Sequence, residues 1–213
     1  MPDTLFGAYI DALGQIAQSA SVTTGDGREL DLDTTIRRMG NEMRAAHERG
    51  NRIFFVGNGG SAGICSHMAT DYSKNGGMRA SALNDGATLT CLGNDYGYES
   101  VFAKQIEWHA RPEDILVAIS SSGRSQNILN AVEAARGHDC VCYTLSGFDS
   151  ANPLRRLGDI NVYLANREYG FVEVGHLAVL HAVLDIQMGW RKSESTTVDT
   201  GSAEADVALN KVV

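Results

Sequence analysis

The middle of the chain alternates between short apolar runs and longer segments whose apolar residues recur at helical spacing. Short apolar runs bounded by small or polar residues are typical of buried strands, and the longer segments are typical of helices. We predict strands at 53–56, 80–83, 115–119, 140–145 and 160–164. Because helices separate these strands, the connections must cross over, which predicts an α/β domain with a doubly wound, mostly parallel sheet.

The predicted helices connect the strands and extend the domain at its N-terminal side. In residues 4–20, apolar side chains recur at helical spacing, and a second helix is predicted at 32–49 after a polar loop at 21–29. Further helices are predicted from Ser61 onward and at 98–108, 125–136, 153–157 and 172–188, with a helical or irregular stretch at 87–92.

This pattern divides the chain into three parts. Residues 1–50 form an N-terminal helical extension, which we expect to serve oligomer packing. Residues 51–191 form the α/β domain. Residues 192–213 have no apolar period and are rich in small and polar residues, so we expect a disordered tail.

Length, charge and cysteine usage narrow the class of protein. The chain has 213 residues, enough for one domain with a full core, and a net charge of −8 that argues against non-specific binding of nucleic acid. No stretch approaches the roughly 20 apolar residues of a membrane span, and the N-terminus lacks the pattern of a signal peptide. We expect a cytoplasmic protein without nucleic-acid or membrane partners.

The four cysteines also favour the cytoplasm. Cys65, Cys91, Cys140 and Cys142 form no CxxC pair. We predict four buried, free thiols that behave as small apolar residues in a reducing cytoplasm.

Two turns rich in glycine and serine follow predicted strands. The first covers 57–62 (Gly-Asn-Gly-Gly-Ser-Ala) and the second covers 120–125 (Ser-Ser-Ser-Gly-Arg-Ser). A strand that turns through small residues into a helix leaves backbone N–H groups and hydroxyls free to bind phosphate. The candidate ligand-binding residues are Asn58, Gly59, Gly60, Ser61, Ser120, Ser121, Ser122 and Ser125. Arg124 could face the phosphate or solvent. Neither turn matches a dinucleotide or Walker A motif, so nucleotide binding there is disfavoured.

Titratable residues lie on two of the predicted helices. His67 and Asp71 are four residues apart, so they share one helix face and could act as an acid–base pair, as metal ligands or as a surface pair. Glu173, His176 and His181 lie in the apolar last helix, where a polar side chain needs a partner. Either histidine could simply be a satisfied core residue.

A polar segment, 94–99, lies between the two turns. Its Asp95 could cap the following helix or contact a ligand, together with Asn94.

Taken together, these motifs resemble the sugar isomerase (SIS) domain family, and within it the phosphoheptose isomerases. The resemblance covers roughly residues 30–190 and rests on 57–62, His67, 93–99, 120–128 and the helix with His176 and His181. It implies a five-stranded parallel sheet flanked by helices and a homotetramer with active sites between subunits. It also implies that Ser120, Ser122 and Ser125 hold the substrate phosphate, with Asn58 and Ser61 on the sugar or phosphate.

The resemblance further implies one zinc ion per active site. The positions that match the family's ligands are His67, Asp71, Glu173 and His181, and the acid–base pair falls on Asp71 and His181. Two positions depart from the family: Asp71 stands where the family has Glu, and Glu173 where it has Gln. The shorter acid moves its carboxylate by about 1 Å, and the added charge suits a metal better than an anionic substrate.

The implied reaction is isomerisation of sedoheptulose 7-phosphate to D-glycero-D-manno-heptose 7-phosphate through an enediol, for heptose-containing glycans. The alternatives are an isomerase of another ketose phosphate and a non-catalytic, regulatory phosphosugar-binding protein. Every implied functional position holds a group able to move protons or bind metal, which favours the enzyme.

Overall fold

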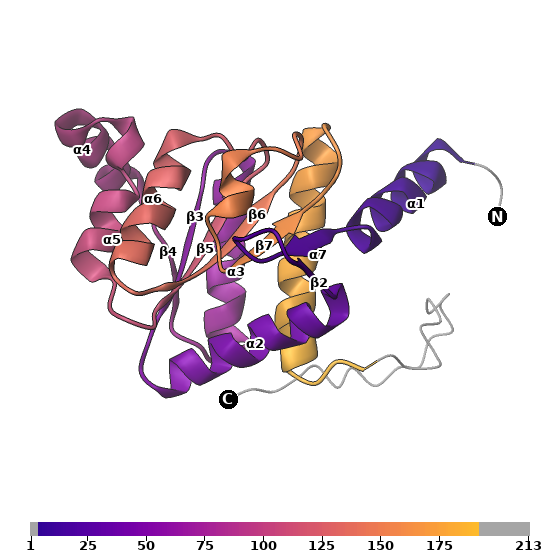
Figure 1. Ribbon diagram of the computed structural model, residues 1–213, viewed down its shortest axis with the longest axis horizontal. Helices are drawn as coiled ribbons and strands as arrows, with labels where there is room; N and C mark the ends of the chain where they lie inside the picture. The colour runs from indigo at the N-terminus through magenta and orange to yellow at the C-terminus, as the bar shows by residue number, and fades with distance from the viewer. Residues whose placement is uncertain (1–3, 192–213) are drawn as a thin grey trace, which may run out of the picture.

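The computed structural model describes residues 4–191, and the predicted tail at 192–213 lies outside the described residues. At its centre five parallel strands are ordered β4-β3-β5-β6-β7. Their bounds are Ile53–Gly57 (β3), Ala80–Ala82 (β4), Ile115–Ser120 (β5), Val141–Ser146 (β6) and Ile160–Tyr163 (β7). The predicted doubly wound α/β fold is confirmed, with its five parallel strands (Figure 1).

The sheet has seven strands because a short antiparallel hairpin extends it. The hairpin consists of β1 (Ser21–Thr23) and β2 (Glu29–Leu30), with β1 paired to β7. The prediction of a loop at 21–29 was therefore wrong at its ends. Strands of three and two residues are too short to show an alternating pattern, and the pairing with β7 rather than local sequence fixes them.

Helices cover both faces of the sheet. One face carries α2 (Leu32–Glu48), α3 (Gly60–Lys74) and α7 (Tyr169–Gln187). The other carries α4 (Gly86–Tyr96), α5 (Ala103–His109) and α6 (Gln126–Gly137), with short 3-10 turns η1 (Tyr98–Ser100) and η2 (Pro153–Arg156). Alternate residues of each strand serve the two cores, as Phe55 packs with the first set of helices and Phe54 with the second.

Helix α7 is long and apolar enough, by length and composition, to cross a membrane, which the sequence had not led us to expect. In the fold it is a core helix. Its residues Val179, Leu180, Val183 and Leu184 are buried in the same cluster as α2 and α3. Packing inside the domain accounts for these apolar residues, while others on the helix, such as Val174, stay exposed within one chain.

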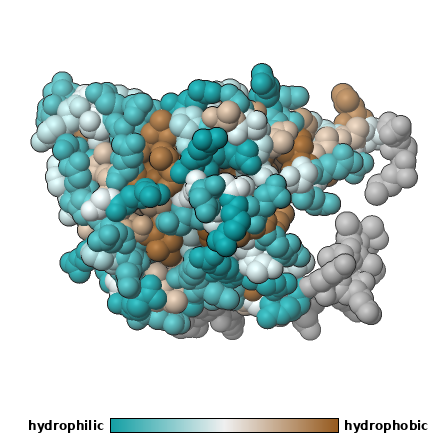
Figure 2. Space-filling model, in the orientation of Figure 1, coloured by the Kyte–Doolittle hydropathy of each residue, from teal (hydrophilic) through white to brown (hydrophobic). Residues whose placement is uncertain are grey.

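The two N-terminal helices differ in their packing. Helix α2 buries Met39 and Met43 in the domain core. Helix α1 (Leu5–Gln18) has no buried residue and projects from the domain, with Leu5 91% and Phe6 74% exposed (Figures 1 and 2). Of the predicted oligomer-packing segment, α1 is the part that stays largely exposed: Tyr9 stacks on Phe171 of α7, while Leu5 and Phe6 remain uncovered within one chain.

Three of the four cysteines are buried free thiols, as predicted, but Cys91 is exposed on α4. Burial raises the pKa of Cys140 and of Cys142 to about 12. The prediction for Cys91 was wrong. Apolar residues flank it in the sequence, but helix α4 buries only Leu92 and leaves Cys91 exposed.

Candidate active site

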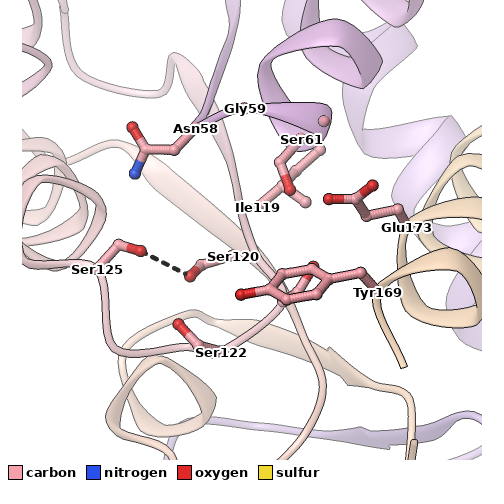
Figure 3. Close-up of a pocket in the computed structure, with 11 residues that line it drawn as sticks. Asn58, Gly59, Ser61, Ile119, Ser120, Ser122, Ser125, Tyr169 and Glu173 are labelled. Atoms are coloured by element: carbon pink, nitrogen blue, oxygen red, sulfur yellow. Dashed lines mark hydrogen bonds between the residues drawn. The ribbon is translucent and has the colours of Figure 1, made fainter. Parts of the chain in front are cut away.

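The two glycine- and serine-rich turns lie side by side at the carboxyl ends of β3 and β5. These strands are neighbours in the sheet, and the helices that follow them, α3 and α6, cover opposite faces. Such a reversal opens a crevice at the carboxyl ends of the strands. A cavity of about 260 Å³ occupies it, lined by Asn58, Gly59, Gly60, Ser61, Ile119, Ser120, Ser121, Ser122, Ser125, Tyr169 and Glu173 (Figure 3).

The first turn presents the start of α3 to the cavity. Gly59 has φ +56° and provides no side-chain cap, so the first N–H groups of α3 remain available. A Cβ atom at Gly60 would lie 2.4 Å from Oε2 of Glu173. Glycine at position 60 therefore allows the Glu173 carboxylate to approach the positive end of the helix.

The side chain of Asn58 is fixed by neighbours on the opposite side of the turn. Its amide and that of Asn127, on α6, exchange two hydrogen bonds of 2.9 Å. The hydroxyl of Tyr98 also donates to Asn58 Oδ1, at 2.9 Å. Both partners belong to the motifs quoted for the family resemblance, but their contact with Asn58 depends on the fold and was not predicted.

The second turn is tied together by its own hydroxyls. The Ser120 and Ser125 hydroxyls lie 3.2 Å apart (Figure 3). The N–H of Gly123 also donates to Ser120 Oγ. Helix α6 begins at Gln126 without a side-chain cap hydrogen bond from Ser125. Ser121 Oγ is buried and has no hydrogen-bond partner among the described residues. A ligand with several oxygen atoms would satisfy these groups.

Gly123 and Asn152 hold the second turn against the loop after β6. Gly123 has φ +62°, and a Cβ there would lie 2.0 Å from Asn152 Oδ1. Asn152 is buried and donates to Ser146 Oγ, Gly147 O and Asp149 O. The serine hydroxyls therefore rest on a backbone that a larger residue at 123 would displace.

The cavity lining carries no cation. Arg124 points to Asp149, with which it forms an ion pair of 2.6 Å, and is not part of the lining. The Ala151 amide and the Arg124 guanidinium hold the pKa of Asp149 below its usual range. Neutral donors and helix N-termini are thus available for an anion, and Glu173 is the charged residue of the lining.

Tyr169 is a lining residue that the sequence analysis missed. It is the first residue of α7, which begins three residues earlier than predicted. Its ring is 63% exposed, lies across the cavity in Figure 3 and contacts Phe148 edge to face at 4.9 Å. No local signal distinguishes this tyrosine from an ordinary turn residue.

His67, Asp71 and His181 form a separate cluster between α3 and α7. Nε2 atoms of the two histidines lie 3.1 Å apart, and Asp71 Oδ2 lies 3.4 Å from His67 Nε2 and 4.0 Å from His181 Nδ1. Three donor atoms within 4.8 Å of one another could hold a metal ion. The side chains are 51%, 19% and 34% exposed, respectively, so the cluster is open to ligands or to another chain.

Glu173 does not join this cluster within one chain. It lies eight residues before His181 on a continuous helix, a rise of about 12 Å. Its carboxylate faces Gly60 and the serine cavity instead. Glu173 could share a metal with His181 only if α7 were broken between them or if another subunit supplied one of the ligands, and the described α7 is continuous. A contribution from a different subunit is the route that is left.

His176, Asn94 and Asp95 do not line the cavity, whereas Tyr98 of the segment 94–99 contacts the lining residue Asn58. His176 is fully buried, with Nε2 3.1 Å from the Ser146 carbonyl, and burial lowers its pKa to about 4. Asn94 and Asp95 are exposed in the last turn of α4 and hydrogen-bond to each other. The expectation that Asp95 caps a helix was wrong, because α4 continues through it to Tyr96.

Comparisons with known proteins point in one direction. A family model described as "SIS domain" matches residues 28–147. A phosphoheptose isomerase from Pelobacter propionicus is 32% identical over 162 residues, 73% of this chain and 85% of that protein. Another, from Helicobacter hepaticus, is 34% identical over 161 residues, 73% of this chain and 82% of that protein.

Solved structures agree. The phosphoheptose isomerase from Neisseria gonorrhoeae superposes with a TM-score of 0.74 at 28% identity, covering 86% of this chain and 96% of that one. The structure from Francisella tularensis gives 0.73 at the same identity and coverage.

Proposed function

Because the chain belongs to the SIS domain family and is an aldose–ketose isomerase of phosphosugars, we propose that it converts sedoheptulose 7-phosphate to D-glycero-D-manno-heptose 7-phosphate. The product would serve heptose-containing glycans. The observation that carries the phosphosugar part is the cavity where two uncapped helix N-termini and five serines converge. Helix N-termini bind phosphate without a cation.

In this proposal the phosphate binds at the second turn. Ser120, Ser122 and Ser125 would donate to its oxygens, together with the first N–H groups of α6. Ser121 Oγ is buried without a partner among the described residues, so this hydroxyl would be an additional donor to the phosphate. Asn58, Gly59, Gly60 and Ser61 would contact the sugar. Glu173 would accept hydrogen bonds from sugar hydroxyls, since a carboxylate beside the phosphate itself would repel it. Asn94 and Asp95 do not line the cavity and are left out of this site.

Asp71 and His181 are the proposed acid–base pair. Isomerisation moves one proton between C1 and C2 and another between their oxygens, so it needs two groups that exchange protons. The Asp71 carboxylate has two oxygens, and one can accept a proton while the other faces the imidazoles. The His181 imidazole is a group that can donate or accept a proton. Their separation of 4.0 Å lets both reach adjacent atoms of one substrate.

The residues of this cluster fit zinc. Two imidazoles and a carboxylate are the ligand types of a catalytic zinc site that keeps an open position. We propose one zinc per active site on His67, Asp71 and His181, with Glu173 added only if a neighbouring subunit supplies it. Bound zinc would polarise a carbonyl oxygen and favour negative charge on it.

In this proposal the protein is a cytoplasmic homotetramer. The cavity lining and the His67–Asp71–His181 cluster are separate in one chain, since Gly60 and His67 are about 10 Å apart along α3. A substrate could span both groups, or subunits could combine the cavity of one with the cluster of another. The exposed apolar face of α1 supports assembly.

The first test is an NMR assay of the purified protein with sedoheptulose 7-phosphate, with and without zinc. Appearance of the aldoheptose phosphate supports the proposal. Binding without turnover, or turnover of a shorter ketose phosphate only, would overturn the assigned substrate.

The Asp71→Asn variant tests the proton-transfer role. Turnover should fall at least a hundredfold, the order of a lost general acid or base, while phosphosugar binding is retained. Retained activity would remove Asp71 from this role. Mixing Asp71→Asn with Ser122→Ala subunits should restore activity if sites are shared between chains, and should not if each chain works alone.

A further inference from the structure

A second polar cavity lies at the amino ends of the parallel strands, opposite the serine turns at their carboxyl ends. Its volume is about 200 Å³, and its lining comes from segments that precede β3, β4 and β5. The charged and aromatic residues that line it are Arg52, Arg79, Trp108, His109, Arg111 and Asp114. It is separate from the candidate active site, because the two cavities share no lining residue.

Within the described part of the chain, the arginines of this cavity have no acidic partner. Among residues 4–191, no carboxylate oxygen lies within 4.0 Å of the guanidinium groups of Arg52, Arg79 or Arg111. The chain carries 26 acidic and 18 basic residues, so partners are abundant elsewhere. All three arginines are exposed, so solvent screens their mutual repulsion, and an anion bound among them would offset what is left of it.

The carboxylate in the cavity is already engaged. Asp114 is 2% exposed, and its oxygens accept hydrogen bonds from the Arg52 and Arg111 amides and from Asn51 Nδ2. These donors are neutral. With His109 neutral, three guanidinium charges and one carboxylate give the lining a net charge of +2.

A competing explanation is that the arginines only satisfy helix ends. Helices α2 and α5 end beside the cavity, and cations there are favourable. Arg79 does this, donating from Nη1 to the Gly50 carbonyl at 2.9 Å. In the described part of the chain, the guanidinium groups of Arg52 and Arg111 make no hydrogen bond, so helix capping does not account for them.

Trp108 supplies a flat apolar wall next to these charges. Its side chain is 56% exposed and meets the His109 ring edge to face at 6.5 Å. An exposed tryptophan beside unpaired arginines suits a ligand with an aromatic ring and an anionic group.

We propose that this cavity binds a free nucleoside phosphate, with the phosphates on Arg52, Arg79 and Arg111 and the base against Trp108. This cavity and the isomerase cavity share no lining residue, so the nucleotide is not the substrate of the isomerisation. This proposal is independent of the sugar that the enzyme isomerises.

The test uses the full chain with Trp190→Phe, which leaves Trp108 as the single tryptophan of the two in the sequence. ADP, pyrophosphate and adenosine are titrated separately while Trp108 fluorescence and heat of binding are followed. ADP should bind and change the fluorescence, pyrophosphate should compete with it more weakly, and adenosine should bind at least tenfold more weakly than ADP.

Substitutions locate the site. The Arg52→Gln/Arg111→Gln double variant should lose at least tenfold in ADP affinity, because it removes two charge-assisted hydrogen bonds to the phosphates. Its basal isomerase activity should be unchanged. Arg37→Gln, an exposed arginine of α2 outside this cavity, is the matched control. The proposal is overturned if ADP does not bind, if adenosine binds as well as ADP, or if the double variant binds ADP like the parent.

Discussion

Replacing Glu173 by Gln should tighten phosphosugar binding. The change keeps the shape of the side chain and removes the charged group from a cavity built for an anion. A volume of about 260 Å³ corresponds to a sphere about 8 Å across, which sets the scale of the distance between carboxylate and phosphate.

The magnitude follows from that distance. Two unit charges about 8 Å apart repel by about 2 kcal/mol at an effective dielectric constant of about 20, and salt screening reduces this to somewhat below 1 kcal/mol. A phosphate carries a charge of about −2, which doubles the screened repulsion between the carboxylate and the phosphate to about 1.5 kcal/mol. Removing it should lower Kd about tenfold.

The same substitution should slightly destabilise the fold. The Glu173 carboxylate lies against Gly60 at the positive end of α3, an interaction of about 0.5 kcal/mol. Ligand affinity and the free energy of unfolding should therefore change in opposite directions.

The assay is isothermal titration with sedoheptulose 7-phosphate in the Asp71→Asn background, where turnover does not consume the ligand. The difference in Kd should widen at low ionic strength, where screening is weaker. Glu133→Gln, an exposed residue of α6, is the matched control and should leave Kd unchanged. An unchanged or higher Kd for Glu173→Gln would refute the placement of the carboxylate beside the ligand.

Three further predictions concern the second turn, the buried histidine and the metal. Gly123→Ala should lower the free energy of unfolding by about 1–3 kcal/mol, because alanine is strained at φ +62° and its Cβ would overlap Asn152. The control Gly27→Ala, at φ +87° with open space around it, should cost only about 1 kcal/mol, and chemical denaturation measures both. Burial lowers the pKa of His176 to about 4 from an unfolded value of 6.5, so its contribution to stability is complete above pH 6.5 and is lost as pH falls toward 4, by about 3 kcal/mol in total. An NMR titration in which His176 protonates near pH 6.5 in the folded protein would contradict this. Chelation should abolish turnover and zinc should restore it, and His67→Ala should bind zinc at least tenfold more weakly by titration with a zinc indicator; activity that survives complete removal of zinc would argue against a metal role.

The sequence was most informative where local chemistry decides the structure. Five apolar runs identified the parallel strands because buried strands need continuous apolar residues. The two serine turns identified the cavity, because turns that follow neighbouring parallel strands meet at the carboxyl ends of those strands. The spacing of His67 and Asp71 placed them on one face, and the fold added His181 to them.

What the sequence could not provide depends on contacts between distant segments. Tyr169 reaches the cavity because α7 starts at it, and Asn127 orients Asn58 across 69 positions of sequence. The distance of Glu173 from His181 was computable from helix geometry, but the neighbour of its carboxylate, Gly60, was not. Polar residues such as Asn94 and Asp95 look equally suited to a ligand site and to a solvent-exposed helix end.

The hairpin of β1 and β2 limits how this protein can associate. It pairs antiparallel with β7, and Asn161 Nδ2 donates to the Thr23 carbonyl to hold it there. At the other border, β4 has only the three residues Ala80–Ala82. Short or covered borders are poor templates for intermolecular strand addition, the usual route to amyloid-like aggregates. Self-association is therefore directed to helical surfaces, where contacts are finite and can close into a defined particle rather than a growing fibre.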